Sequence, residues 1–103
     1  MNIRLNEILT TINGFYHYTD KMIHQYISLI NEVIEIIGKI KAPPASILEG
    51  AKNSAITELS NELANRLNDS FFNAPLERRK NEFKISKMLV GVAIGNVLTN
   101  MQS

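Results

Sequence analysis

A chain of 103 residues is long enough for one domain with a single core and too short for two. Eleven Lys and Arg against ten Asp and Glu leave a net charge of +1, so no field of the whole molecule steers it towards nucleic acid or an acidic membrane. The absence of Cys excludes disulfides, thiolate metal sites and a cysteine nucleophile. Residues 1–9 lack the continuous apolar region of a signal peptide, so we expect a cytoplasmic protein.

The first third of the chain carries a nearly unbroken helical pattern of apolar residues. Its seven-residue step, typical of a helix-packing seam, is carried by Leu5, Ile12, Tyr26, Val33 and Ile40. Asn13-Gly14 is a turn signal inside this pattern, and Thr19 or Asp20 would cap a fresh helix. Because the apolar phase is the same on both sides, the sequence favours one long helix that covers residues 3–41 and bends at Gly14. Two separate helices are the alternative. Such a helix, about 58 Å long, would overhang its neighbours, and a homodimer would cover the overhang.

The middle helix follows Ala42, Pro43 and Pro44, since each Pro removes a backbone donor and disfavours helix in the residue before it. Ser46 and Glu49 have the spacing of a capping box, and the helix is expected to run to about Ser70. Its predicted inner face carries Ile47, Leu48, Ala51, Ala55, Ile56, Leu59, Leu63 and Leu67.

Small residues make the first half of this middle helix thin: Gly50, Ala51, Ser54 and Ala55. Each glycine inside a helix costs roughly 1 kcal/mol relative to Ala, and close approach of another helix is the usual reason to keep one. Gly91 and Gly95 in the last helix are the expected counterpart of the thin half.

The last helix is expected from the cap at Asn73, Ala74 and Pro75 to about Asn100. Its stretch 85–98 is apolar on nearly every side. One face carries Phe83, Val90, Ile94, Val97 and Met101, and another carries Ile85, Met88, Leu89 and Val92. This predicts a helix enclosed in a core or an interface; a membrane-surface segment and a strand are the alternatives. The run covers 14 residues, against about 20 for a membrane span.

Short connections between these helices predict an all-α protein, a small antiparallel bundle of three to four helices in a single domain over 1–103.

The densest positive run stands at the start of the last helix: Arg78, Arg79, Lys80, Lys84 and Lys87. Basic side chains there oppose the helix macrodipole, which suggests use in binding. Glu77 and Glu82 can pair with part of the run, and nucleic-acid binders usually show a broader basic footprint. The sequence therefore favours a solvated helix face, with a protein or lipid contact and nucleic acid as the alternatives.

Two other groups are candidates for contact with a protein. Glu58, Glu62 and Asp69 are predicted to share an exposed acidic line, which suits a basic partner. The only aromatic run is 15–18, and Tyr16 or Tyr18 with His17 should be exposed, as binding hot spots are. The plainer alternative for both groups is the ordinary outer surface of a bundle.

His17 and His24 are the only histidines. They stand seven residues apart, about 10.5 Å along a helix, which is too far to share one metal. Asp20 and His24 offer two ligands without a third. No serine or cysteine triad and no Gly-rich phosphate loop is present. We therefore expect no metal, no cofactor and no enzymatic activity; an enzyme built around His17, Tyr18, Asp20 and His24 is the weakest alternative.

No motif in the sequence names an activity. The interpretation that fits the size and the lack of chemistry is a non-enzymatic protein-binding module that occludes its partner, an analogy at the level of a class. Most concretely we expect a bacterial immunity protein, or antitoxin, that neutralises a cognate toxin. A secretion chaperone and a small homo-oligomeric nucleic-acid-binding regulator using residues 78–87 are the alternatives, while membrane and nucleic acid are not the expected partners.

Overall fold

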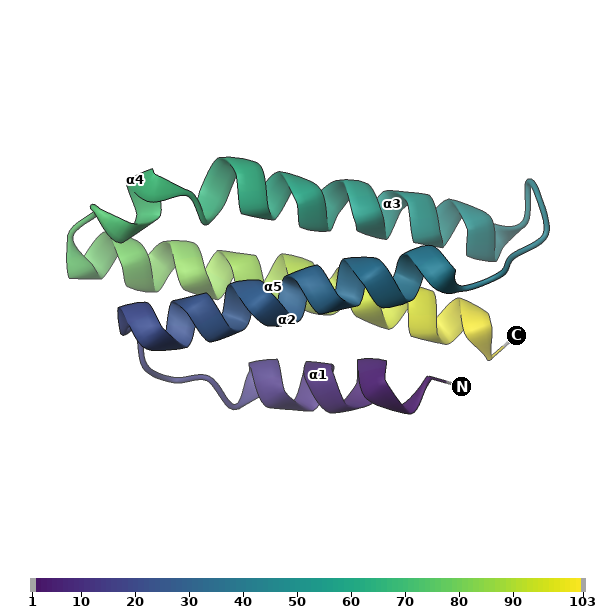
Figure 1. Cartoon of the computed structure of the whole chain (residues 1–103), viewed down its shortest axis with the longest axis horizontal. Coiled ribbons are helices and arrows are strands. Elements are labelled where there is room, and N and C mark those ends of the chain that lie inside the picture. The colour runs from purple at the N-terminus through teal and green to yellow at the C-terminus, as the bar shows by residue number, and fades with distance from the viewer. Residues whose placement is uncertain (1, 103) are drawn as a thin grey trace.

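The computed structural model describes residues 2–102, and all regular structure in that range is helical. The elements in chain order are α1 (Ile3–Asn13), α2 (Asp20–Lys39), α3 (Ile47–Asn61), the π-helical turn η1 (Glu62–Arg66), α4 (Asp69–Phe72) and α5 (Leu76–Met101). The four long helices lie side by side in a body of 44 × 23 × 18 Å, and both chain termini lie at the same end (Figure 1). The prediction of an all-α protein is confirmed.

A non-helical connection separates α1 from α2, so the prediction of one continuous helix over 3–41 is wrong. The N–H of Gly14 donates to the carbonyl of Thr11 at 3.1 Å, which closes the last turn of α1. The hydroxyl of Thr19 accepts the N–H of Met22 at 3.2 Å and caps α2. The turn signal at Gly14 and the cap at Thr19 therefore set the helix boundaries, although the apolar phase is unbroken.

The seven-residue repeat still marks the core, because its fully buried members are Leu5, Ile12, Tyr26 and Val33. Phe15 and Tyr18, in the connection, also pack against the core, so the apolar phase continues through a break in the helix. The chain turns back on itself at this connection (Figure 1). The overhang from which a homodimer was expected does not exist.

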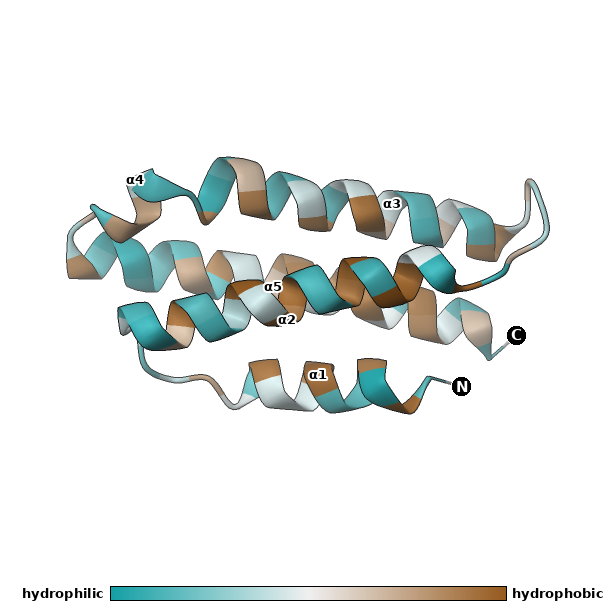
Figure 2. Ribbon diagram, viewed as in Figure 1, coloured by the Kyte–Doolittle hydropathy of each residue, from teal (hydrophilic) through white to brown (hydrophobic). Residues whose placement is uncertain are grey.

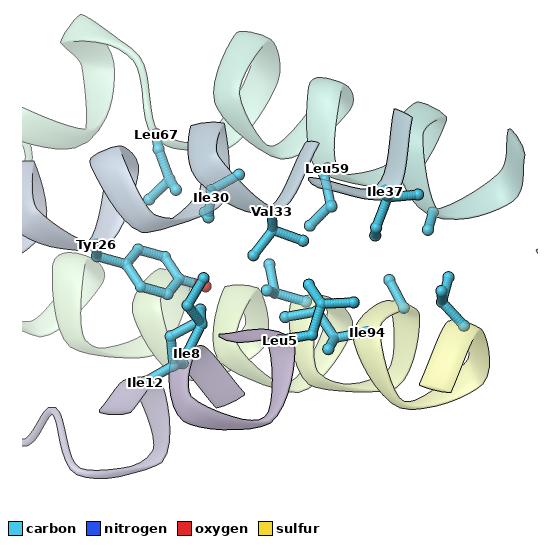
Figure 3. Packing of buried hydrophobic residues seen from close by; sticks show 14 of the residues in the cluster. Leu5, Ile8, Ile12, Tyr26, Ile30, Val33, Ile37, Leu59, Leu67 and Ile94 are labelled. Carbon is cyan, nitrogen blue, oxygen red and sulfur yellow. The ribbon is translucent and has the colours of Figure 1, made fainter. Parts of the chain in front are cut away.

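The core is formed where the apolar stripes of the long helices meet. Figure 2 shows hydrophobic and hydrophilic segments alternating along α1 and α2, the pattern of amphipathic helices. In Figure 3 side chains of α1, α2, α3 and α5 converge, among them Ile8, Val33, Leu59 and Ile94, all fully buried.

The structure confirms the predicted start of α3 and shows an earlier end. The hydroxyl of Ser46 accepts the N–H of Glu49 at 3.1 Å, as a helix cap does. A π-helical turn, η1, then follows α3, and in it the N–H of Leu67 bonds to the carbonyl of Glu62 at 2.9 Å, five residues back. The extra residue in this turn shifts the inner face after Glu62, so that the next buried residue is Leu67 and not Arg66.

Only one side of α5 is buried by the rest of the chain. The fully buried face carries Phe83, Val90, Ile94 and Val97. On the other side Met88 and Val92 are 61% and 67% exposed, so the prediction of a segment enclosed on both sides is wrong for this chain by itself. The predicted cap Asn73 ends α4 instead, and Pro75 directly precedes α5. None of the helices within residues 2–102 combines the length and the apolarity needed to cross a membrane.

Gly91 and Gly95 do not pack against α3, so the predicted pairing of these glycines with the thin half of the middle helix is wrong. Within residues 2–102, a Cβ atom at Gly91 would meet only the side chain of Leu9 in α1, at 3.9 Å, and one at Gly95 would meet nothing within 4 Å. The boundary between α3 and α5 is formed by other small residues, including Ala55 and Ala93.

Replacing Gly95 with alanine is expected to stabilise the protein by about 0.5–1 kcal/mol, because Ala loses less backbone freedom in a helix and meets no neighbour here. Thermal unfolding should show a Tm higher by roughly 2–8 °C. A Tm at or below that of the wild type would contradict the open space that the structure shows beside Gly95.

Candidate functional site

The connection between α1 and α2 divides its aromatic run between the core and the solvent. Phe15 and Tyr18 are half-buried, whereas Tyr16 is 72% exposed and His17 is exposed. Tyr18 packs edge-to-face on Phe83 with the ring centres 5.5 Å apart. Of the two expected alternatives, Tyr16 with His17 is therefore the exposed pair, while Tyr18 packs its ring against the core.

Contacts from α5 hold this connection in place. The Nζ of Lys87 donates to the carbonyl oxygen of Phe15 at 2.9 Å. The same ammonium group lies 5.8 Å from the ring centre of Tyr16 and 5.2 Å from that of Phe83, within the range of cation–π attraction. Tyr16 is thus presented from a backbone that is fixed on both sides.

The anchors lead into an aromatic cluster around Tyr26, which is fully buried. Its ring lies 4.9 Å from that of Phe83 and 6.5 Å from that of Phe15. Its hydroxyl shares a hydrogen bond of 2.9 Å with the hydroxyl of Ser86. Burial raises the pKa of the Tyr26 hydroxyl above its usual range, the bond to Ser86 opposing this shift. The hydroxyl therefore stays protonated at neutral pH and acts as a structural group.

Tyr16 and His17 lie beside two residues of the first turns of α5. Together with Leu76 and Lys80 they line a shallow groove of about 360 Å³. Leu76 is itself 60% exposed. We call these four residues the loop-end surface. A second shallow groove, of about 370 Å³, lies on the other side of the connection, towards Lys21 on α2.

The three predicted acidic residues do not share one surface. Glu62 is 4% exposed, and its carboxylate accepts from the Nε of Arg66 at 3.0 Å. Its prediction as an exposed contact residue is therefore wrong, because Glu62 follows the buried Leu59 by three residues and lies on the same face of the helix. Glu58 lies half-buried between α3 and α5, and Asp69 lies exposed beside His24 at the end of the bundle that carries α4.

The basic run is also divided, since two of its members serve the fold. Arg79 bonds to the carboxylate of Asp20 at 2.9 Å and to the carbonyl of Phe72 at 2.8 Å, which ties α5 to α2 and α4. Lys87 holds the α1–α2 connection. The members that keep their charged groups at the surface are Arg78, Lys80 and Lys84. The five basic residues therefore do not form one continuous basic surface.

The two histidines lie apart. His24 stacks on Phe72 with the ring centres 4.7 Å apart, and it shares a shallow groove with Asp20 and Asp69. Within residues 2–102 no three His, Asp or Glu side chains are placed to hold a metal ion.

A groove of about 290 Å³ runs between α3 and α5. Ser54 and Glu58 line it on α3, and Leu89, Val92 and Asn96 line it on α5, with alanines at its floor. We call it the α3–α5 groove. Sequence reasoning assigned Val92 to the interior and so missed this feature.

Comparisons with known protein families, with curated proteins and with solved structures found no match for this chain. Its function is therefore inferred from the chemistry of its own surfaces. The most distinctive are the loop-end surface, with an exposed aromatic ring on a fixed backbone, and the α3–α5 groove.

Proposed function

We propose that this protein is a non-enzymatic binding module for another protein, which it engages through the loop-end surface and thereby occludes. The observation that carries the proposal is Tyr16, a large amphipathic side chain that is 72% exposed between two anchored neighbours. Rigid exposed rings are typical of binding hot spots, because little conformational freedom is lost when they are covered. The scaffold that we propose is the antiparallel bundle of three to four helices expected from the sequence.

The loop-end surface has the composition of a contact centre. Tyr16 and Leu76 supply apolar area, and His17 and Lys80 supply donors at its edge. The partner should therefore offer an apolar side chain that fits between Tyr16 and Leu76, with an acidic or carbonyl group near Lys80. Asp69 lies at the same end of the bundle as a further polar contact, in a separate groove.

In its most concrete form the proposal is a cytoplasmic bacterial immunity protein that neutralises a cognate toxin. The small size and the fixed binding loop support it, since occlusion requires a rigid surface and no chemistry. Co-expression with the product of a neighbouring gene tests this form. Growth should be rescued by the wild type and lost with Tyr16→Ala if that product is the toxin.

The binding surface itself is tested by capture from cells of the native host, using the tagged wild type, Tyr16→Ala and Leu76→Ser. Truncating a hot-spot residue lowers affinity about tenfold or more, so a protein captured by the wild type should be depleted with both variants. Ile47→Ser is the matched control, because Ile47 is 79% exposed and lies at the start of α3, outside the grooves of the connection.

Thermal melts should match for all four proteins, since the side chains of Tyr16, Leu76 and Ile47 are mostly in solvent. The proposal is wrong if no protein captured by the wild type is depleted by Tyr16→Ala and retained by Ile47→Ser.

A further inference from the structure

α5 carries an apolar stripe that the rest of residues 2–102 covers only in part. Ile85, Met88 and Val92 are 39%, 61% and 67% exposed, and their spacing of three and four residues places them on one helix face. We call them the α5 stripe. A contiguous apolar patch on a protein surface is typical of an interaction site.

The stripe opens sideways into the α3–α5 groove, with Val92 common to both. Leu89 and Val92 form the apolar wall, and Ser54 on α3 is too short to fill the space opposite. The α5 stripe and the α3–α5 groove together form an exposed apolar helix face next to a groove. This is the shape in which an amphipathic helix buries its apolar side chains.

Among the described residues, Glu58 is the only charged one that lines this groove. It is half-buried, and the part of the chain that the structure describes provides no ion-pair partner for it. A carboxylate with reduced access to water attracts a cation more strongly than a fully solvated one does. Charge complementarity therefore requires a Lys or Arg on whatever covers the groove.

A second copy of this chain fits the stripe poorly. The stripe covers residues 85–92, which is only about 10 Å of one helix. That is a small contact for a stable dimer, because such an interface buries about 800 Å² on each partner. A two-fold interface pairs this patch with itself, and none of Ile85, Met88 and Val92 supplies a positive charge for Glu58. A short helix of another protein avoids both costs.

We propose that the α3–α5 groove and the α5 stripe bind an amphipathic helical segment of a partner protein, with apolar residues at i, i+3 or i+4, and i+7 and a Lys or Arg that pairs with Glu58. This site is separate from the loop-end surface. It gives the protein a second contact, made by packing of one helix against two.

Two synthetic helical peptides with the same apolar face, one flanked by Lys and the other by Glu, test the proposal. Their affinities are measured by fluorescence anisotropy against the full chain, and the contacted amides are mapped by NMR. The Lys peptide should bind about fivefold more tightly than the Glu peptide and shift the amides of Leu89, Val92 and Asn96. Glu58→Lys should reverse the preference, and Val92→Glu should abolish binding of both peptides.

Ile47→Glu is the control for Val92→Glu, because it adds the same charge at an exposed residue outside the groove. Tyr16→Ala should leave peptide binding unchanged, which separates this site from the loop-end surface. The proposal is overturned if neither peptide shifts the groove amides, or if the preference survives Glu58→Lys. It is equally overturned if sedimentation shows a wild-type dimer that Val92→Glu converts to monomer, since a second copy would then be the occupant.

Discussion

Replacing Arg66 with methionine is expected to destabilise the protein by about 3–5 kcal/mol, the cost of leaving a buried charge without its partner. The Nε of Arg66 donates to both carboxylate oxygens of Glu62, at 3.0 and 3.2 Å, and its Nη1 donates to Glu82. Glu62 is 4% exposed, so water cannot take the place of the guanidinium. Glu82 is less enclosed and should tolerate the loss.

Urea denaturation followed by circular dichroism measures this effect. The matched control is the double variant Glu62→Met with Arg66→Met, which removes both charges and keeps apolar volume inside. It should be within about 1–2 kcal/mol of the wild type, because a buried ion pair can often be replaced by packed apolar residues at little cost. A single variant as stable as the double variant would show that Glu62 is not enclosed as described.

Sequence reasoning misplaced Glu62 because it followed only the apolar residues of the helix. Leu59, Leu63 and Leu67 follow one another at four-residue steps, which predicted an inner face without Glu62, although a residue three positions after Leu59 also lies on its face. In the structure the α-helical spacing keeps Leu59 and Glu62 inside, and the extra residue of the π-helical turn then brings Leu67, in place of Arg66, to the inner face, with Leu63 half-buried. Periodicity records which residues are apolar, but it does not record a local change of helical pitch.

Apolar periodicity also failed to predict the break after α1. Phe15 and Tyr18 continue the apolar pattern from an extended connection, so the phase alone could not distinguish one helix from two. The local signals did: Gly14 ends α1, and Thr19 caps α2. Caps and turn residues therefore predict the boundary between α1 and α2 better than the continuity of the apolar phase does.

Half of the loop-end surface could be predicted, and half could not. Tyr16 and His17 stand out as part of the only aromatic run of the chain. Leu76 and Lys80 join them only through the fold, about 60 residues later in the sequence, and nothing near Pro75 marks Leu76 as exposed. The α5 stripe was recognised as apolar, but the sequence could not show whether its own chain or another molecule covers it.

Replacing Phe83 with alanine is the second change expected to have a large effect, a loss of about 3–5 kcal/mol for a large side chain removed from a close-packed core. Phe83 is fully buried and touches the rings of Tyr18 and Tyr26 edge-to-face. It also lies under the ammonium group of Lys87, which holds the α1–α2 connection. The variant should therefore weaken both the core and the support of the loop-end surface.

Two measurements separate these effects of Phe83→Ala. Urea denaturation gives the loss of stability, and amide hydrogen exchange under native conditions reports on residues 15–18. Exchange there should accelerate more than in α3, because Tyr18 and Lys87 lose their shared neighbour. Phe83→Leu, which keeps most of the volume, should cost less than about 1.5 kcal/mol. If exchange in the connection rises no more than in α3, Phe83 does not fix the loop, and the rigidity that makes Tyr16 a suitable contact must come from Lys87 and Phe15 alone.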